Sequence, residues 1–379
     1  MKTTVVTRQK IWKKLSGTQK RIYNFCWGIA RRSEINVLYL RSSGEDKEDI
    51  EKHNKTANFK IYSLDSFKED KHSYGAAWRN WKDITPWANL REFRKFGNAI
   101  SSLKPDTVVF TYLDQVFLLD ALPPNVKKIL DTNDFVFIRR MRFRSKYLSY
   151  PIVTSLEEEI DIYKQFDALI AISDEEYRMF STCYSKPILY FPHVAIPEDF
   201  NTHINKELLH LPASTMYLAG AQPNNLRDAE LFLQPVAKLL SQQGIPVEIW
   251  GTLCNQLFDK SYGLQLMGTY DDLSFSTNKR YVGLNPATVG SGIKIKNIDL
   301  MANGIPVIMT NYAAEGFPDI PHEKIVIQNK AEDFSYVVLE LIKNPNLYLE
   351  IARSQKNYIL NNFTPEVYVQ SLLDSISSL

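Results

Sequence analysis

The chain has 379 residues, of which 44% are hydrophobic and 23% are charged, a composition that supplies a sizeable core and excludes the disordered class. At roughly 150 residues per domain, this length favours two domains. The three cysteines lie far apart and form no C-x-x-C pair, which argues against a zinc site or a disulfide framework and favours a reducing compartment.

The basic residues are unevenly distributed, although the net charge is only +2. Two clusters suit phosphates or an anionic membrane surface, and the alternative is that both are ordinary solvated faces. No nucleic-acid-binding module accompanies them, so we expect no nucleic-acid partner. The first cluster comprises Lys2, Arg8, Lys10, Lys13, Lys14, Lys20, Arg21, Arg31 and Arg32, and the second comprises Arg139, Arg140, Arg142, Arg144 and Lys146.

The N-terminal stretch lacks the apolar core of a signal peptide, and no apolar run approaches the roughly 18 residues that a membrane-spanning helix needs. We therefore expect a cytoplasmic protein. The basic clusters would allow it a peripheral contact with the inner face of an anionic membrane.

The first half of the chain alternates short apolar runs with helical patterns. This alternation predicts a parallel sheet with helices on both faces. The expected strands are residues 3–7, 35–40, 59–64, 106–112, 127–132, 167–173 and 187–192, and helical patterns lie between them, for example at 17–33 and 155–166.

The alternation breaks in a stretch rich in proline, asparagine and histidine and then resumes, which indicates a second domain of the same kind. We expect an α/β fold of two Rossmann-like, doubly wound domains that face each other across a cleft, with ligands at the carboxyl ends of the strands. The expected parts are an N-terminal domain (1–195), a linker (196–213), a C-terminal domain (214–362) and a final helical segment (363–379) that packs back toward the first domain. Further strands are expected at 215–220, 246–251, 264–268, 280–286, 306–310 and 324–328, with helices near 227–242, 293–303 and 331–343.

Neither half shows G-x-G-x-x-G after its first strand, and G-x-x-x-x-G-K-[ST] does not occur, so dinucleotide oxidoreduction and ordinary ATP hydrolysis lose their main support. The strongest chemical signal is the G-S-G turn at residues 290–292, between an expected strand and helix. Small residues there let backbone N–H groups approach an anion at the positive helix end. Lys294 and Lys296 add positive charge, and Asp299 can accept hydrogen bonds from sugar hydroxyls. The pattern indicates a nucleotide; the alternative is a tight turn whose lysines face water.

The run GSGIKIKNIDLMANGIPVIMTNYAAEGF (290–317) resembles the donor-binding motif of family-4-like glycosyltransferases of the GT-B fold. The segments at 216–240, 247–251 and 264–273 resemble the opening strand and helix and the following motifs of the family's second domain. In the first domain, KKILDTNDFVFIRRMRF and EEEIDIYKQFDALIAISDEE resemble the family's acceptor-side segments. The resemblance extends from about residue 105 onward.

The resemblance implies a nucleoside-diphosphate sugar as donor, bound mainly by the second domain. Backbone N–H groups of the G-S-G turn would meet the diphosphate, the lysines would neutralise it, Asp299 would hold the ribose, and Gly268 and Tyr270 would lie beside the base. The implied donor-binding residues are Gly220, Asn225, Gly268, Tyr270, Gly290, Ser291, Gly292, Lys294, Lys296 and Asp299, and the implied acceptor-side residues are Gly17, Asn133, Arg139 and Arg140.

The sequence departs from the family pattern at four positions. Asp299 replaces the usual glutamate, Ser291 stands where many relatives have an acidic residue, and Asn133 stands where a histidine is frequent. The paired glycines after the first strand are missing, with only Gly17 nearby.

Glycosyl transfer builds negative charge on the leaving diphosphate, which the helix end and the lysines are suited to stabilise. No D-x-D pair occurs, so we expect neither a metal nor another cofactor. Asp134 is the candidate catalytic residue, as a general base in an inverting enzyme. In a retaining enzyme, which the resemblance implies, the departing phosphate would take the proton and Asp134 would bind sugar hydroxyls. Asp131 is expected to be a strand-end cap.

Other polar residues are expected to be structural: Glu157, Glu158 and Glu159 as a solvated helix start, and His193 near the linker. The basic run at 139–146 would hold a lipid-linked diphosphate, and the aromatic segment at 76–93 would either touch the membrane interface or pack on its own domain.

The leading hypothesis is a glycosyltransferase that transfers a sugar to a glycan or lipid-linked acceptor in the synthesis of surface polysaccharide or glycoconjugate. A catalytically inactive GT-B-shaped binding or partner subunit and a nucleotide-sugar epimerase are the alternatives.

Overall fold

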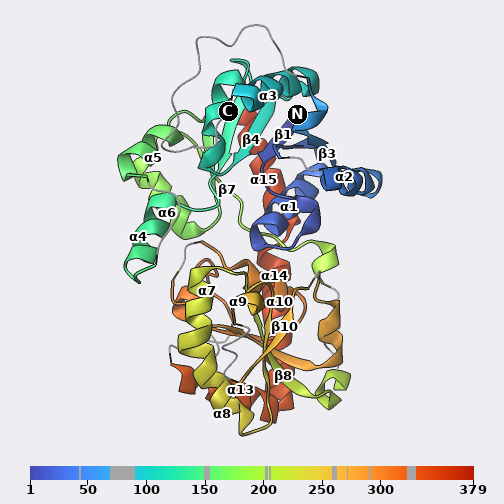
Figure 1. Cartoon of the computed structure of the whole chain (residues 1–379), viewed down its shortest axis with the longest axis vertical. Coiled ribbons are helices and arrows are strands. Elements are labelled where there is room, and N and C mark those ends of the chain that lie inside the picture. The colour runs from blue at the N-terminus through green and yellow to red at the C-terminus, as the bar shows by residue number, and fades with distance from the viewer. Residues whose placement is uncertain are drawn as a thin grey trace.

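The computed structural model in Figure 1 describes residues 1–41, 44–68, 90–148, 154–200, 204, 206–257, 263–270, 272–289, 292–321 and 330–379. The chain forms two α/β domains stacked along the long axis, each built around a parallel sheet. The predicted strand at 324–328, most of the aromatic segment at 76–93, and both Gly290 and Ser291 lie outside the described residues.

The N-terminal domain contains a seven-stranded sheet in the order β3-β2-β1-β4-β5-β6-β7, with every pair parallel. Its central strands are buried throughout because helices cover both faces. The order reverses between β1 and β4, which creates a crevice at their carboxyl ends. The strands are β1 (Lys2–Thr7), β2 (Glu34–Tyr39), β3 (Lys60–Ser63), β4 (Thr107–Thr111), β5 (Lys127–Asp131), β6 (Ala168–Ala171) and β7 (Ile188–Tyr190).

The helices of this domain divide its core into two layers. One face of the sheet packs on α1 and on the final helix of the chain, and the other face packs on α3. The helices are α1 (Gly17–Ala30), α2 (Gly44–Thr56), α3 (Leu90–Leu103), α4 (Val136–Arg144), α5 (Leu156–Tyr163), α6 (Asp174–Cys183) and α15 (Pro365–Ser378). In Figure 1 the red α15 lies beside the blue α1, so the two ends of the sequence share one core.

The C-terminal domain contains a five-stranded parallel sheet in the order β10-β9-β8-β11-β12, with its reversal between β8 and β11. The strands are β8 (Ala213–Leu218), β9 (Val247–Trp250), β10 (Leu264–Gly268), β11 (Arg280–Asn285) and β12 (Val307–Met309). The helices are α7 (Pro223–Asp228), α8 (Gln234–Ser241), α9 (Cys254–Leu257), α10 (Ile295–Ala302), α11 (Asn311–Ala314), α13 (Ala331–Lys343) and α14 (Pro345–Asn362). A π-helical turn at Ala229–Leu233 joins α7 to α8, so the single helix predicted at 227–242 is composite.

The domains touch through the loops at the carboxyl ends of their strands. A Cβ on Gly17, at the start of α1, would lie 3.1 Å from Ile295 Cδ1 at the start of α10. The chain crosses between domains twice, and the crossings are joined by a hydrogen bond from Ala195 N to Phe363 O of 2.7 Å. The predicted fold of two doubly wound domains is therefore confirmed.

The expectation that residues 157–159 form a solvated helix start is wrong for Glu159. Glu158 does form a capping box with Ser155 at the start of α5. Glu159 is fully buried, and its carboxylate accepts the N–H groups of Val136 (2.8 Å) and Phe137 (2.7 Å) in the first turn of α4. A helix that begins inside the core needs such an acceptor, and the sequence around Glu159 does not reveal which helix it serves.

Candidate functional site

The candidate site is built around the turn that joins β11 to α10. The helix begins at Ile295, two residues later than the start predicted for 293–303. It begins late because Gly292 takes the left-handed conformation, with φ of 60°, and Lys294 is extended. The N-terminal N–H groups of α10 therefore lie after the loop that leaves β11, at the carboxyl end of the sheet where its strand order reverses, a geometry that favours anions.

Close packing and a buried amide network fix the direction of α10. A Cβ on Gly283 would lie only 2.9 Å from Leu300 Cδ1, so glycine in β11 lets the helix approach the strand. Asn285 Nδ2 donates to Asn297 Oδ1 (2.6 Å), and Asn297 Nδ2 donates to the carbonyl of Ala313 (2.8 Å). These bonds connect the strand, the helix and the next loop, and the sequence analysis did not identify them.

Lys294 and Lys296 lie at this turn in different surroundings. Lys294 Nζ donates to the carbonyl of Gly292 (2.8 Å) and lies 3.9 Å from Glu315 Oε2. Lys296 Nζ lies 4.3 Å from the centroid of the Tyr217 ring. Burial lowers the pKa of both ammonium groups. An incoming phosphate would therefore restore electrostatic stabilisation that water no longer supplies.

Asp228, which the sequence analysis did not single out, faces Lys296 from the end of α7. Burial raises the pKa of Asp228, an effect that the hydrogen bond from Thr288 Oγ1 (2.8 Å) and the Lys296 charge oppose. Its Oδ2 atom has no hydrogen-bond partner among the described residues. The carboxylate is thus a local counter-charge to Lys296.

Asp299, the implied ribose ligand, lies on α10 against the N-terminal domain. Its Oδ1 atom accepts a hydrogen bond from Lys20 Nζ of α1 (2.6 Å), and the same ammonium lies 2.9 Å from Asp199 Oδ1. His193 Nε2 is 3.8 Å away and its side chain is fully buried. Burial alone would raise the pKa of Asp299, but Lys20 and His193 hold it below its usual range. The carboxylate is therefore ionised and bound across the domain boundary.

A cavity of about 300 Å³ brings several of the implied residues together. Its lining includes Gly17 and Lys20 from the N-terminal domain and Tyr270, Asp299 and Asn303 from the C-terminal domain. The volume is at the lower end of the roughly 300–1,000 Å³ of small-molecule sites. Gly17, assigned to the acceptor side by the resemblance, thus lies beside the implied ribose carboxylate.

Tyr270 and Gly268, implied to lie beside the base, follow β10. Gly268 is left-handed, with φ of 88°, and its carbonyl accepts the N–H of Gly251 (2.7 Å). The Tyr270 ring contacts Trp250 and Phe275 edge-on, and these two rings stack with centroids 3.8 Å apart. The Tyr270 side chain is therefore held in an aromatic cluster at the edge of the cavity.

Gly220 and Asn225 lie at the carboxyl end of β8, on the other side of the reversal from β11. Asn225 Nδ2 donates to the carbonyl of Gly220 (2.9 Å), and its Oδ1 accepts from Tyr217 Oη (3.1 Å). The Asn225 amide is thus engaged in its own loop, and Gly220 is the more exposed of the two.

The acceptor-side segment follows β5. Asn133 is left-handed, with φ of 56°, and its amide donates to the carbonyl of Asp131 (3.2 Å). Asp134 is buried and forms an ion pair with Arg139. Asp131 is buried and paired with Arg21, in agreement with the structural role expected for it.

Two arginines of α4 extend this side. Arg140 donates to the carbonyl of Thr154 (3.1 Å). Arg142 connects the domains, with Nη1 donating to Glu315 Oε2 (3.0 Å) and Nη2 lying 2.7 Å from Glu175 Oε1. The sequence analysis placed Arg142 in a basic cluster without identifying this bridge, because its acidic partners are remote in sequence.

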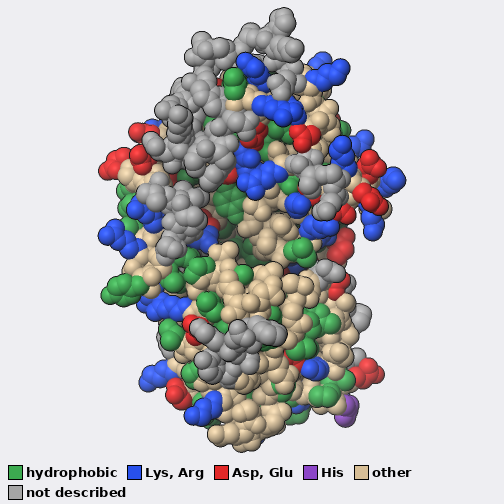
Figure 2. Space-filling view, in the orientation of Figure 1, with side chains coloured by type: hydrophobic (Ala, Val, Ile, Leu, Met, Phe, Trp, Pro, Cys, Tyr) green, Lys and Arg blue, Asp and Glu red, His purple; other side chains and the backbone are tan. Residues whose placement is uncertain are grey.

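Most of the N-terminal basic cluster is neutralised within the protein. Figure 2 shows many Lys and Arg side chains on the N-terminal domain, several beside acidic ones. The ion pairs are Lys2 with Glu34, Arg8 with Glu92 and Asp114, Lys10 with Asp46, Lys13 with Asp49, Lys20 with Asp199 and Asp299, and Arg21 with Asp131. The cluster is therefore a set of structural ion pairs as much as a positive surface.

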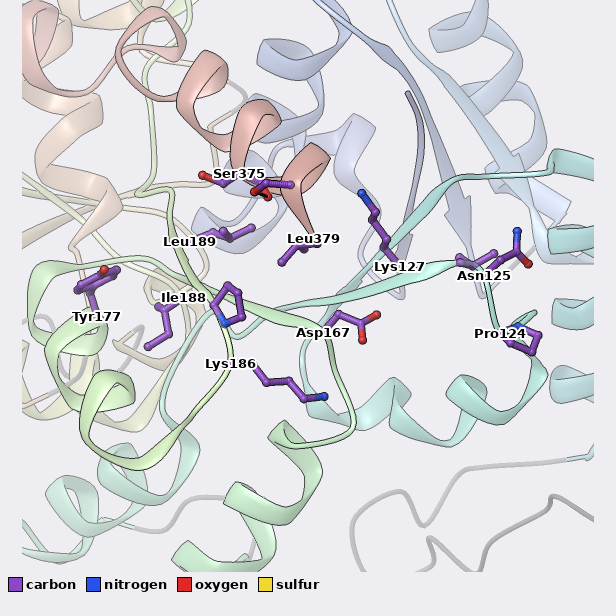
Figure 3. A pocket seen from close by; sticks show the side chains of 13 residues that line it. Pro124, Asn125, Lys127, Asp167, Tyr177, Lys186, Ile188, Leu189, Ser375 and Leu379 are labelled. Carbon is purple, nitrogen blue, oxygen red and sulfur yellow. Dashed lines mark hydrogen bonds between the residues drawn. The ribbon is translucent and has the colours of Figure 1, made fainter.

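A larger cavity of about 830 Å³ lies away from the cleft, between the amino ends of β5 to β7 and the end of α15 (Figure 3). Three of its charged groups are engaged within the protein: Lys127 Nζ donates to the carbonyl of Ile376 (2.8 Å), Lys186 Nζ to that of Phe166 (2.6 Å), and Asp167 accepts the N–H of Lys128 (2.8 Å).

Across the described ranges, no group of three or more His, Cys, Asp or Glu side chains is arranged to hold a metal ion. In the same ranges, no helix has the length and apolar character needed to cross a membrane.

The chain matches no family model. It is 24% identical over 244 residues to an uncharacterized 44.6 kDa protein in the cps region of Klebsiella pneumoniae, and the match spans 61% of each chain.

Solved structures share the fold over nearly the whole chain. The chain is similar to Anabaena Alr3699/HepE in complex with UDP, with 11% identity and a TM-score of 0.65 over 100% of both chains. It is similar to a mutant of S. aureus TarM in complex with Fondaparinux, alpha-GlcNAc-glycerol and UDP, with 12% identity and a TM-score of 0.71 over 99% of both. Sucrose-phosphate synthase from Thermosynechococcus elongatus has 11% identity and a TM-score of 0.72 over 100% of this chain and 99% of that one. The chain has the GT-B fold of these glycosyltransferases.

Proposed function

We propose that the chain is a glycosyltransferase that moves a sugar from a nucleoside-diphosphate sugar to a glycan or lipid-linked acceptor. The observation that carries this proposal is the arrangement along α10: a left-handed Gly292 and the ammonium groups of Lys294 and Lys296 lie at its start, and the ionised carboxylate of Asp299 lies one turn further along it. This arrangement fits a diphosphate with an attached ribose. The presence of UDP in the HepE and TarM structures supports it.

The proposed mechanism depends on electrostatic stabilisation of the leaving group. As the glycosidic bond breaks, charge accumulates on the diphosphate, beside the N-terminus of α10 and the two lysines. Because these cations are already desolvated, they interact with that charge more strongly than exposed lysines would. We propose that no metal is required.

We propose a retaining reaction in which the departing phosphate accepts the acceptor proton. The ion pair with Arg139 occupies Asp134, the candidate base, and favours a role in holding sugar hydroxyls. The acceptor would enter along α4, where Met141 is 46% exposed and Tyr147, just after the helix, is 99% exposed next to basic residues. Such a surface suits a lipid-linked acceptor at an anionic membrane, and we place the reaction in surface polysaccharide or glycoconjugate synthesis.

A catalytically inactive partner subunit is the second candidate. Asn133, at a position where relatives often have histidine, uses its amide to hold its own turn. An epimerase finds less support, because Asp131 is bound in a buried ion pair and His193 is enclosed behind Asp299.

The test is thermal stabilisation by nucleoside diphosphates and their sugars, followed by turnover with acceptors. A ligand at about one hundred times its Kd adds about 2.7 kcal/mol to the unfolding free energy. Lys296→Ala and Asp299→Ala should both lose this stabilisation, whereas Lys238→Ala, an exposed lysine on α8, should keep it. If none of these ligands stabilises the native chain, the proposal is refuted. Stabilisation without turnover favours the inactive subunit.

A further inference from the structure

A glutamate that the mechanism does not yet use faces the phosphate turn from the N-terminal domain. Glu176, in the first turn of α6, is 3% exposed. Its Oε2 accepts the N–H of Ile172 (3.2 Å), and its Oε1 has no hydrogen-bond partner among the described residues. A Cβ on Gly292 would lie 3.6 Å from that Oε1 atom. The unpartnered oxygen therefore lies close to Gly292, in the turn at which the diphosphate is proposed to bind.

The surroundings of this carboxyl group favour its neutral form. Burial and the nearby Asp134 raise the pKa of Glu176 to about 8, against the opposing effect of Arg21 and of backbone N–H groups at Ile172 and Phe135. The other ionisable groups that face it are Tyr163 of α5 and Tyr190 of β7, and its own helix adds the exposed Asp174 and Glu175. Among the described residues, Glu176 forms no ion pair. A neutral carboxyl group can donate a hydrogen bond, which a carboxylate cannot.

The comparison with Glu159 shows that Glu176 is not simply another buried structural acid. Both oxygens of Glu159 are occupied, by the N–H groups of Val136 and Phe137 and by the Tyr163 hydroxyl. Glu176 has one oxygen that accepts a hydrogen bond and one, close to Gly292, that has no hydrogen-bond partner among the described residues. A buried polar atom without a partner is costly, so its retention points to a ligand.

We propose that Glu176, as a neutral carboxylic acid, donates a hydrogen bond to a phosphate oxygen of the bound donor and so positions the diphosphate on α10. The inference rests on the proposed function, because the ligand is the same nucleotide. Hydrogen bonds to charged acceptors are the stronger kind, and an ionised Glu176 would instead repel the diphosphate. The site would thus combine cations from one domain with a neutral donor from the other.

The experiment is calorimetric titration of UDP, GDP and ADP into the full chain between about pH 6.5 and 9.5, for the native protein, Glu176→Gln and Asp174→Asn. Glutamine keeps a donor and cannot ionise, while Asp174→Asn makes the same acid-to-amide replacement on an exposed residue of the same helix turn. Deprotonation of Lys296 at alkaline pH changes the affinity of all three proteins alike, so its effect cancels in the ratio of their Kd values.

We expect Glu176→Gln to bind within about twofold of the native protein near pH 7, and the native Kd to rise relative to that of the variant by about tenfold per pH unit above the pKa. Asp174→Asn should follow the native protein. A ratio that does not change with pH overturns the inference, while a native chain that binds none of the three nucleotides overturns the proposed function as well.

A second variant guards against misfolding of the first. Glu176→Asp keeps the acid but withdraws it by one methylene, so affinity near pH 7 should fall several-fold while the loss at alkaline pH remains. Native affinity in a folded Glu176→Asp protein would contradict the proposed contact.

Discussion

Replacement of Gly292 by alanine tests both the backbone of the phosphate turn and its contact with the opposite domain. A left-handed conformation costs a non-glycine residue about 1–2 kcal/mol. The new Cβ would also lie 2.7 Å from Ile172 Cδ1, closer than real Cβ contacts, and overpacking of this kind costs roughly 1–3 kcal/mol. We therefore expect Gly292→Ala to lower the free energy of unfolding by about 2–5 kcal/mol in urea denaturation.

Gly244→Ala is the matched control, since Gly244 has φ of 69° but no atom within 4 Å of the added Cβ. It should show only the backbone cost of about 1–2 kcal/mol. In a double-mutant cycle, Gly292→Ala combined with Ile172→Ala should lose about 1–3 kcal/mol less than the sum of the two single variants. Equal losses for Gly292→Ala and Gly244→Ala, together with additive behaviour in the cycle, would show that Ile172 does not press on the turn in solution.

Three further outcomes can be checked by denaturation. Lys20→Met leaves two partly buried carboxylates without their cation and should cost toward the lower end of roughly 3–5 kcal/mol; unchanged stability contradicts the bridge. Asn297→Ala leaves the Asn285 amide and the Ala313 carbonyl unpaired and should lower the free energy of unfolding by about 2–4 kcal/mol. A decrease below about 1 kcal/mol would mean that water replaces the Asn297 amide. Burial raises the pKa of Glu176 from 4.5 to about 8, so the unfolded chain loses this proton at a lower pH than the folded chain does. Between pH 4.5 and about 8, the unfolding free energy of the native protein should therefore fall relative to that of Glu176→Gln, by up to about 1.4 kcal/mol per pH unit. A difference in unfolding free energy that stays constant with pH contradicts the raised pKa.

The strands were predictable because parallel strands buried on both faces are short apolar runs, and this pattern is local. β4 and β11 are buried at every position and were located within one residue at each end. Helix boundaries were less predictable where a cleft-facing loop sets them. The start of α10 depends on a left-handed Gly292 and an extended Lys294, and neither conformation is visible in composition or periodicity.

The candidate site was predictable on the side where its residues are contiguous in sequence. Gly292, Lys294, Lys296 and Asp299 all follow one strand, so a single motif contains them. The groups opposite them come from distant segments. Lys20 is 279 positions from Asp299, and no local pattern distinguishes it from its basic neighbours.

Glu159 and Glu176 show the same limit for acids. Both lie in runs of acidic residues at helix starts, where a solvated face is the ordinary interpretation. Only the tertiary structure separates the glutamate that caps another helix from the one whose second oxygen is unpartnered.

The two sides of the cleft hold carboxyl groups in opposite states, and the partners of each group explain the difference. Lys20 contacts Asp299 and, with His193, keeps its pKa low, so the carboxylate stays an acceptor, which is what the hydroxyls of a ribose require. Glu176 lies beside Asp134 in a buried position, keeps its proton at neutral pH, and is thereby suited to donate to a phosphate. Neighbouring acids with separated pKa values are a common way to assign distinct roles to identical chemical groups. Exchange of the two environments would place a negative charge against the proposed diphosphate and a neutral acid against the proposed ribose, so the observed arrangement supports the proposed donor.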